Sequence, residues 1–496
     1  MTQSEKLESF YSRLSELHHL NCISALLGWD QRVCMPPAAV QGRAAQREYI
    51  AVMAHRKATD PEFSSVVDEL YQEIDSLSED DQVNVREVKR QLDIDRRLPE
   101  EFVSEMSQAS SVGYSTWQEA RPRNDWESVG PLLERTVKLS RQKAELIGYE
   151  EHPYDALLDL YEPGMTTSIL KPLLLKLADE LRKIVPSVLQ RFANVSPLKG
   201  DFPEETQKSL CHRVALDLGF DLRWGRIDSS AHPFTTTIGR NDVRITNRFS
   251  RDTFIPGLYG TIHETGHALY DIGLPQKWLG TPLGSPVSLG IHESQSRIWE
   301  NPVGRSREFC VYLSRLLPEL FPEFATTPDE LWNWVNLVQP SLIRVDADEV
   351  TYCLHIVIRM LLEERLIVGE LAVADLPEAW NDLYVEYLGI RPPDVKDGVM
   401  QDVHWYSGSI GYFPTYALGN LYNAMMIESA LLAIPDLYEK IEEGQFAEFL
   451  NWLKDNVHRH GMRYHGRELI KRITGTDLNP DSFTRYLRRK FLPEGV

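Results

Sequence analysis

Helical periodicity runs through most of this chain and restricts the folds open to it more than any other feature. Apolar residues recur at i, i+3 and i+4 spacing, which places them on one face of a helix. The clearest such segments are 132–146, 169–192, 350–368 and 418–433. Proline and glycine separate these segments, and no fixed-period repeat or low-complexity linker divides the chain. We therefore expect a single large, mostly α-helical body over residues 1–496.

One segment departs from this pattern. Residues 234–238 are rich in β-branched side chains, residues 239–241 supply turn chemistry, and Val243 and Ile245 then alternate with polar neighbours. The pattern predicts a β-hairpin, in which the period of two separates aliphatic from polar side chains. The polar face consists of Asp242, Arg244 and Thr246. An ordinary half-buried hairpin with a solvated polar face is an equal alternative from this stretch alone.

The acidic balance of the chain limits its partners. It contains 53 Lys and Arg against 73 Asp and Glu, for a formal net charge of −20. Such a surface repels phosphate backbones and anionic membranes, so we expect neither nucleic acid nor a membrane as a partner. No stretch approaches the roughly 18 to 20 apolar residues of a membrane span. Residues 1–20 have the spacing of an amphipathic helix rather than the apolar core of a signal peptide.

The cysteines indicate a reducing compartment. They are odd in number, scattered, and without C-x-x-C spacing: Cys22, Cys34, Cys211, Cys310 and Cys353. Buried or half-buried thiols in the cytoplasm are favoured over a disulfide framework or a thiolate zinc site.

The segment after the hairpin carries the strongest chemical signal. The motif His263-Glu264-Thr265-Gly266-His267 lies within residues 250–273, whose first and last residues have helix-capping chemistry. Positions i and i+4 differ by roughly 40° around a helix, so both imidazoles leave one face and can reach one zinc ion. Glu264 leaves the helix beside that face, where it can act as a general base. Gly266 removes a side chain where another backbone can approach. The alternative is a helix whose histidines are satisfied by neighbours.

A catalytic zinc needs a third protein ligand and an open position. Glu293 follows the motif after a Gly- and Pro-rich loop at 280–286, which leaves room for a return helix alongside the first. Glu300 is a weaker competitor for the same role. With His263 and His267, Glu293 completes a His-His-Glu site, and the set predicts a zinc-dependent peptidase.

At this point the sequence resembles the carboxypeptidase Taq family of zinc metallocarboxypeptidases. The resemblance rests on separate motifs in order: His232-Pro233-Phe234, Asp242-x-Arg244-x-Thr246, His263-Glu264-x-x-His267, His292-Glu293-Ser294-Gln295-Ser296-Arg297, Ile343-Arg344-x-x-Ala347-Asp348, and Gly398-x-x-Gln401-Asp402-x-His404-Trp405. Trp29-Asp30-Gln31 and Met35-Pro36 also look like the family's N-terminal region. The match spans about residues 25 to 420, although residues 55–130 carry no matching motif.

The resemblance implies an almost entirely helical fold with a deep groove closed at one end, related to neurolysin-like and angiotensin-converting-type peptidases. It also implies a homodimer, zinc or cobalt as the activating metal, and peptide substrates with a free C-terminus. Their single C-terminal amino acids would be released with broad specificity.

A carboxypeptidase must hold the free α-carboxylate of its substrate, and a guanidinium does this in bidentate fashion. The resemblance makes Arg344 the expected anchor, with Asp348 orienting it. Both lie in a segment, 342–368, that we predict to be one amphipathic helix, which places them at i, i+4. The alternative is an ordinary ion pair on a helix surface.

Residues 398–417 form a predicted loop rich in Gly and Ser. In a zinc peptidase, a histidine or tyrosine donor stabilises the oxyanion opposite the metal. His404 is the first candidate, and Tyr412 or Tyr416 could donate to the oxyanion or to the carboxylate. Aromatic packing is an equal alternative for each tyrosine. Gln401, from the same motif, is a further candidate for contacting substrate.

The hairpin gains meaning beside a metal helix, because an edge strand can hold an extended peptide by strand addition. His232, Asp242 and Arg244 then become substrate-binding candidates. Zinc-bound histidines also need their second ring nitrogen held. Asp271 and Asp348 are the candidates for this task.

Two other functions remain open at the level of sequence. One is an endo- or dipeptidyl-acting metallopeptidase of the same helical class, because residues alone do not show whether the groove is closed. The other is a peptide-binding protein that no longer catalyses. Its expected sign would be a lost ligand or a lost Glu264, and both are intact.

Overall fold

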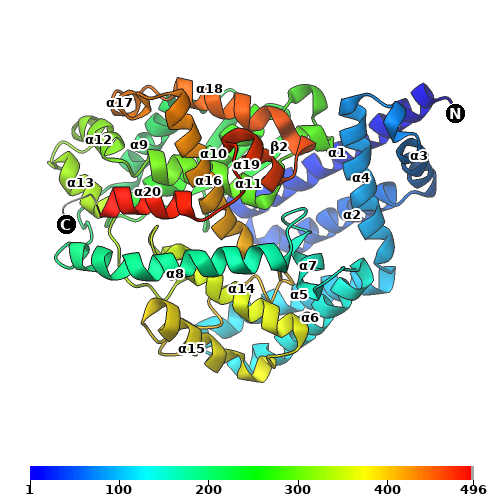
Figure 1. The fold of residues 1–496 in the computed structure, drawn as a ribbon, viewed down its shortest axis with the longest axis horizontal. Helices are drawn as coiled ribbons and strands as arrows, with labels where there is room; N and C mark the ends of the chain where they lie inside the picture. The colour runs from blue at the N-terminus through cyan, green and yellow to red at the C-terminus, as the bar shows by residue number, and fades with distance from the viewer. Residues whose placement is uncertain (493–496) are drawn as a thin grey trace.

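Helices form most of the chain, as its periodicity predicts. The computed structural model describes residues 1–492. Figure 1 shows helices packed on all sides of the molecule, with a small sheet among them. The segments with the clearest periodicity are all helical: α6 (Trp126–Ile147), α8 (Thr167–Phe192), α14 (Tyr352–Val368) and α16 (Pro414–Ala433). The predicted fold class is confirmed.

The N-terminal helices lie together at one end of the molecule (Figure 1). They are α1 (Gln3–Val33), α2 (Val40–Ala58), α3 (Pro61–Gln72) and α4 (Glu79–Arg97). The predicted amphipathic helix at the N-terminus is therefore present and continues to Val33. Thr2 begins it with a capping box, in which its side chain accepts from the backbone N–H of Glu5 and the Glu5 side chain accepts from that of Thr2. Phe10 and Leu14 pack against α3 in a small core of their own.

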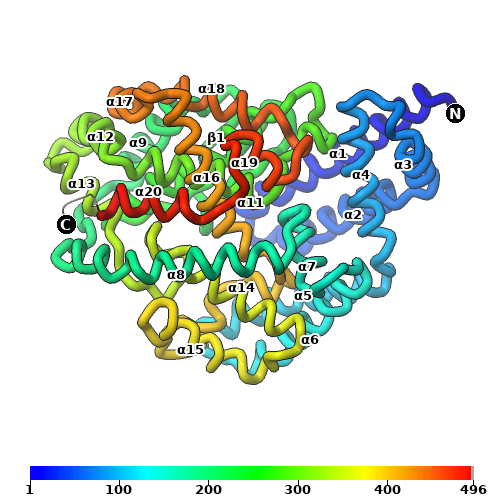
Figure 2. The backbone as a smooth tube through the Cα atoms, in the orientation of Figure 1, coloured from blue at the N-terminus to red at the C-terminus, as the bar shows by residue number. Residues whose placement is uncertain are grey.

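The remaining helices enclose one large apolar core. They are α5 (Glu100–Ala120), α7 (Pro153–Leu158), α9 (Glu204–Asp217), α10 (Ile255–Gly273), α11 (Leu289–Ile298), α12 (Arg307–Leu320), α13 (Pro328–Val335), α15 (Leu376–Leu388), α17 (Leu437–Glu442), α18 (Ala447–Asn456), α19 (Gly466–Thr474) and α20 (Asp481–Phe491). This core joins segments that are far apart in sequence. The backbone trace in Figure 2, for example, shows the last helix, α20, beside α8.

The sheet has three strands in the order β1-β3-β2. The predicted hairpin is present as β2 (Phe234–Gly239) and β3 (Asp242–Asn247), which pair antiparallel. Asn241 adopts a φ of 58° at the turn, a conformation that asparagine tolerates better than most residues. The pattern did not reveal β1 (Gly225–Ser229), which pairs parallel to β3. Only Ile227 in that strand is aliphatic, so its sequence lacks an alternating signal.

Each face of the sheet has its own neighbour. Val243 and Ile245 are buried in a cluster with Ala268 of α10, so the aliphatic face lies on the helix that carries the H-E-x-x-H motif. The polar face is not solvated as an isolated hairpin would be. The Arg244 guanidinium lies 4.3 Å from the ring centre of Trp29, a residue of α1. Helix α1 therefore covers this face.

Helices α10 and α11 approach closely at Gly266, as expected for a glycine that admits another backbone. A Cβ atom added there would lie 2.5 Å from the carbonyl oxygen of Gln295 and 2.7 Å from the Cα of Ser296. Helix α16 meets α11 at a second glycine, Gly419, where a Cβ would lie 2.6 Å from the Cγ of Glu293. Glycines thus allow α11 to pack between its two neighbours.

The structure corrects the predicted helix at 342–368, since α14 begins only at Tyr352. The preceding residues contain a short 3₁₀ turn, Arg344–Asp346. Asp348 accepts hydrogen bonds from the backbone N–H groups of Val350 and Thr351, both at 2.9 Å. An aspartate that binds the local backbone in this way favours a turn over a continued helix. The predicted i, i+4 pair of Arg344 and Asp348 is therefore wrong.

The predicted loop at 398–417 is four residues too long, because α16 begins at Pro414. Proline is favoured in the first turn of a helix, where its missing N–H is not needed. Tyr416 is therefore helical, and Tyr412 lies in the loop just before the helix.

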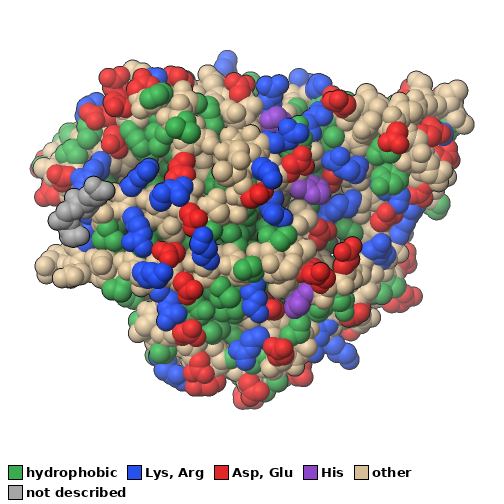
Figure 3. All heavy atoms as spheres, viewed as in Figure 1, with side chains coloured by type: hydrophobic (Ala, Val, Ile, Leu, Met, Phe, Trp, Pro, Cys, Tyr) green, Lys and Arg blue, Asp and Glu red, His purple; other side chains and the backbone are tan. Residues whose placement is uncertain are grey.

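Acidic and basic side chains are interspersed over the face of the molecule in Figure 3. Within residues 1–492, no helix is both long and apolar enough to cross a membrane. In the same range the five cysteines are all free; Cys34 is exposed, whereas the other four are buried or half-buried as predicted.

The close approach at Gly266 predicts the effect of filling it. Gly266→Ala should lower the free energy of unfolding by about 1 to 3 kcal/mol, because the added methyl group must push backbone atoms apart. Gly42→Ala is the matched control, since Gly42 lies in α2 with no atom within 4 Å of its added Cβ. It should stabilise the protein by about 0.5 to 1 kcal/mol. Chemical denaturation measures both changes, and equal stability of the two variants would contradict the packing described.

Candidate metal centre and its surroundings

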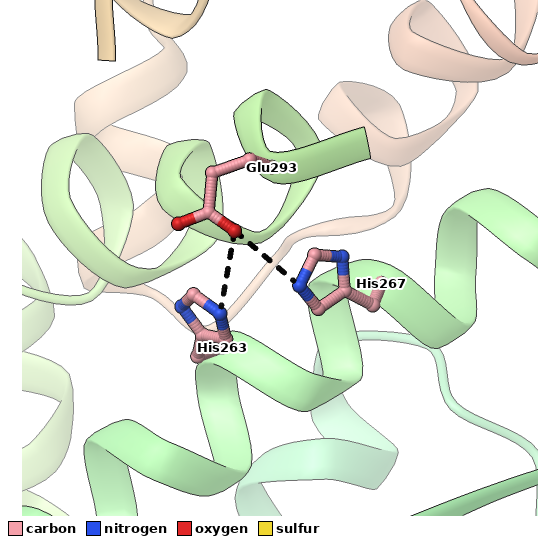
Figure 4. A group of neighbouring side chains, drawn as sticks. All are labelled: His263, His267 and Glu293. Carbon is pink, nitrogen blue, oxygen red and sulfur yellow. Dashed lines mark ion pairs between the residues drawn. The ribbon is translucent and has the colours of Figure 1, made fainter. Parts of the chain in front are cut away.

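The three predicted metal ligands meet at one point. His263 and His267 leave the same face of α10, and Glu293 reaches them from α11 (Figure 4). Glu293 Oε2 lies 3.8 Å from His263 Nε2 and 3.7 Å from His267 Nε2. One ligand atom from each residue lies within 4.8 Å of the other two.

This arrangement fits a divalent metal ion. Two atoms that each lie about 2.1 Å from zinc, at a tetrahedral angle, are about 3.4 Å apart. The observed separations require only a small inward movement of the side chains. Two imidazoles and a carboxylate are also a donor set of catalytic zinc sites, where the fourth position stays open to water or substrate.

The second ring nitrogen of His263 is held by Glu300, with 2.8 Å between Nδ1 and Oε2. This corrects the sequence-based choice of Asp271 or Asp348 for that task. Arg297 and Arg305 donate to the same carboxylate at 3.2 and 3.3 Å. Burial opposes ionisation of Glu300, but Arg297 and His263 together hold the pKa of its carboxyl well below the usual range. Glu300 therefore stays charged and orients a ligand instead of serving as one.

Arg297 also acts on the third ligand. Its Nε donates to Glu293 Oε1 at 2.8 Å, which leaves Oε2 directed at the two histidines. The guanidinium thus neutralises the buried Glu293 and selects the oxygen that faces the metal position. Arg297 belongs to one of the family motifs, but its sequence position does not predict this role.

Glu264 lies beside the ligand pair, as the motif predicts. Its Oε2 accepts a hydrogen bond of 2.7 Å from the Thr235 hydroxyl on β2. Burial raises the pKa of the Glu264 carboxyl, although His263 and Thr235 oppose the change. Thr235 was missed by sequence reasoning. It lies on the hairpin face opposite the polar residues that were singled out.

Asp271 has a different partner from the one predicted. Its Oδ1 lies 3.1 Å from His292 Nε2, and its Oδ2 accepts from the Thr237 hydroxyl at 2.5 Å. The His292 ring stacks on that of His267, with centroids 4.3 Å apart and an angle of 16° between the planes. Nδ1 of His267 is buried and makes no hydrogen bond within residues 1–492. Stacking, rather than a carboxylate, therefore positions this second histidine.

Arg344 lies in a buried pair with an aspartate other than the one predicted. Its Nε and Nη2 donate to Asp402 Oδ1 at 3.1 and 2.8 Å. Arg359 donates to the second oxygen, Oδ2, at 2.7 Å. Burial opposes ionisation, but the two guanidinium groups hold the pKa of Asp402 far below its usual range. Asp402, and not Asp348, orients Arg344.

Arg344 keeps donors to spare. Nη1 donates to the Tyr352 hydroxyl at 3.0 Å, so Nη1 and Nη2 each make one hydrogen bond with the described residues. Each terminal nitrogen carries two N–H groups, so one on each is left for another acceptor. The ring of Tyr352 lies 4.5 Å from the guanidinium of Arg297. Tyr352 therefore links the surroundings of Arg344 to those of the metal ligands.

Gln401 supports this segment through its side chain. Oε1 accepts from the backbone N–H of Arg344 and from Nη2 of Arg359, both at 2.8 Å. Nε2 donates to the carbonyl of Leu342 at 2.9 Å. With its amide engaged on both sides, Gln401 is placed to hold the turn that presents Arg344.

The structure brings the three oxyanion candidates together. His404 Nε2 lies 3.3 Å from the Tyr416 hydroxyl, and the rings of Tyr412 and Tyr416 are 5.3 Å apart. Burial, with Arg344 and Arg359 nearby, lowers the pKa of His404 to about 4 although Asp402 opposes it. His404 is therefore neutral at pH 7 and carries one N–H that can be donated.

The hairpin candidates lie apart from this group. Asp242 and Arg244 form a bidentate pair, with both contacts at 2.8 Å, on the face of the sheet that α1 covers. His232 is exposed, and its carbonyl accepts from the Ser230 hydroxyl. The two histidine ligands lie on α10, which packs on the other side of the sheet, and Glu293 lies on α11.

Comparisons with known proteins cover the whole of this site. A family model described as carboxypeptidase Taq (M32) metallopeptidase matches residues 9–491. Thermostable carboxypeptidase 1 of Thermus thermophilus is 42% identical over 99% of both chains. The crystal structure of the M32 carboxypeptidase from Deinococcus radiodurans R1 has a TM-score of 0.95 at 39% identity, over 98% of this chain and 99% of that one. A Pyrococcus furiosus carboxypeptidase structure also gives 0.95, at 36% identity over 99% of both chains.

The contact between Glu300 and His263 predicts a change in metal affinity. Glu300→Gln removes the negative charge that holds the imidazole, and partners of this kind are worth about 10- to 100-fold in affinity. Zinc binding measured by competition with a chelator should weaken by that factor. Glu319→Gln, an exposed glutamate on α12, is the control and should bind zinc as the unmodified protein does. Unchanged affinity in Glu300→Gln would show that this contact does not tune the site.

Proposed function

Because the chain belongs to the carboxypeptidase Taq (M32) family of metallopeptidases, we propose that it is a zinc enzyme that releases single C-terminal amino acids from peptides with broad specificity. The sequence motifs indicate the same family. Because relatives in this family are carboxypeptidases, the chain is a metallocarboxypeptidase. The observation that carries the proposal is the convergence of His263, His267 and Glu293 within 4.8 Å.

The metal and Glu264 divide the chemistry between them. Zinc, when bound, polarises the substrate carbonyl and lowers the pKa of water to about 7. Glu264 takes a proton from the attacking water and returns it to the leaving amine. Burial of this carboxyl favours its protonated form, which helps it to hold the proton between the two steps. The Thr235 hydroxyl holds Oε2 in place while this happens.

Arg344 is the proposed anchor for the free carboxylate of the substrate. Its spare N–H groups on Nη1 and Nη2 form a fork that matches a carboxylate. Asp402 prevents the guanidinium from rotating away. On the opposite side of the scissile bond, His404 or Tyr412 donates to the oxyanion as negative charge develops there.

Several finer features complete the proposal. We propose that cobalt can replace zinc, that the enzyme is a cytoplasmic homodimer, and that residues 1–496 form one catalytic domain. His232, Asp242 and Arg244 stay predicted substrate contacts, as do Tyr416, Gln401 and Asp348. The last two make intramolecular contacts that position neighbouring backbone.

One experiment tests the function as a whole. The purified enzyme is given a blocked dipeptide before and after chelation, and then after addition of zinc or cobalt. Activity should disappear with the chelator and return with the metal. Mass spectrometry of longer peptides should show a ladder of single-residue losses from the C-terminus. Internal cuts or paired losses would instead identify an endopeptidase or a dipeptidyl-acting enzyme.

The role of Glu264 predicts a clear separation of binding from turnover. Glu264→Gln keeps the size of the side chain but cannot accept the proton, so kcat should fall by roughly 10²- to 10⁴-fold. Zinc content, measured on the purified variant, should match that of the unmodified enzyme. Glu319→Gln again serves as the control. Retention of normal kcat would contradict the assignment of Glu264 as general base.

The role of Arg344 predicts a loss that depends on the substrate's terminus. Arg344→Lys keeps the charge beside Asp402 but not the fork, and a hydrogen bond to a charged group is worth about 1.5 to 3 kcal/mol. For a peptide with a free C-terminus, kcat/KM should fall about 10- to 100-fold, with zinc content unchanged. The same peptide with a C-terminal amide is the control, because its slow cleavage should be affected little. An equal loss on both peptides would place the anchor elsewhere.

A further inference from the structure

Glu363 is a buried carboxyl group for which the proposed reaction has no use. It lies in α14, and its side chain is fully buried. Burial raises the pKa of this carboxyl to about 7, although hydrogen bonds from its neighbours oppose the change. Placing a carboxylate in such surroundings costs stability compared with a neutral side chain of the same size. The contacts of Glu363 show which part of the chain this buried carboxyl group holds in place.

Both oxygens of Glu363 accept hydrogen bonds from the loop that precedes α16. Oε1 accepts from Nε1 of Trp405 at 2.7 Å, and Oε2 accepts from the backbone N–H of Gly411 at 3.0 Å. A third donor, the Tyr154 hydroxyl of α7, also reaches Oε2. An ionised carboxylate can accept from all three of these donors at once.

Each of the two loop donors is the sequence neighbour of a candidate for oxyanion stabilisation. Trp405 directly follows His404, and Gly411 directly precedes Tyr412. Glu363 therefore clamps the loop at the two points next to the candidates for oxyanion stabilisation. Gly411 has a φ of 92°, and a Cβ there would lie 2.9 Å from the carbonyl group of Leu157. Gly411 is thus packed against Leu157 and hydrogen-bonded to Glu363, and a change in the Glu363 contact would move the adjoining Tyr412.

We propose that Glu363 is a positioning residue that sets His404 and Tyr412 at the distance from the scissile carbonyl that the transition state requires. It touches neither substrate nor metal ligand and acts through the loop alone. This inference rests on the proposed function, since it assumes that His404 or Tyr412 donates to the oxyanion. Donors of this kind contribute to kcat far more than to KM, because the charge they stabilise exists only in the transition state.

The test compares Glu363→Gln with Tyr154→Phe in the zinc-loaded enzyme. The glutamine cannot accept from both loop donors, so kcat should fall about 10-fold or more while KM changes less than about threefold. Tyr154→Phe removes a buried hydrogen bond to the same carboxylate but leaves both loop contacts in place. It should lower the melting temperature and leave kcat within about twofold. A normal kcat in Glu363→Gln, or an equal loss of kcat in Tyr154→Phe, would overturn the proposal.

Two further measurements cover the remaining outcomes. In a His404→Ala, Tyr412→Phe background, adding Glu363→Gln should change kcat less than about threefold, because the groups it positions are already gone. A full additional loss would show that Glu363 acts by another route.

If Glu363→Gln does not fold, Trp405→Phe removes one loop donor from the other side. It should reproduce the loss of kcat, and normal kcat would overturn the inference. Absence of any metal-dependent activity in the unmodified enzyme would instead refute the proposed function itself.

Discussion

The charged side chains buried beside the reaction centre are paired with opposite charges, and this pairing organises the interior on both sides of it. An unpaired ion in a medium of low dielectric constant costs several kcal/mol, whereas a paired and hydrogen-bonded one costs much less. On one side Arg297 is shared by Glu293 and Glu300. On the other side Asp402 is shared by two arginines. Each shared group holds its partners in one rotamer. The geometry of the site is therefore a consequence of charge neutralisation as much as of helix packing.

Helix packing supplies the second condition. The ligands come from two helices, and they meet only because glycines bring α10, α11 and α16 into contact along their backbones. A side chain at Gly266 or Gly419 would collide with α11 and push the helices apart. Helix α11 packs between α10 and α16 and supplies the third ligand, Glu293.

Sequence predicted those parts of the structure that depend on short segments. The i, i+4 spacing of His263 and His267, the hairpin and most helices follow from local periodicity, and Glu293 follows from the ligand count that zinc requires. Partners chosen by tertiary contact were not predictable in this way. Asp402 lies 58 residues from Arg344, and no local pattern distinguishes it from the nearer Asp348. The start of α14 was misplaced for a related reason, since Asp348 binds its own backbone instead of extending the helix. Glu300 was weighed only as a ligand, because its contact with the far side of His263 appears only in three dimensions.

Tyr352 contacts both Arg344 and Arg297, and these contacts couple the binding of peptide to the binding of metal. One end of this residue meets the group proposed to receive the substrate, and its ring faces the group that holds a metal ligand. Coupling between two binding events is reciprocal, because free energy does not depend on the order of binding. The coupling free energy transmitted by Tyr352 must therefore change the affinity for peptide and the affinity for metal by the same factor. A peptide that tightens the hold on the ion will be held more tightly by the loaded enzyme, in the same proportion.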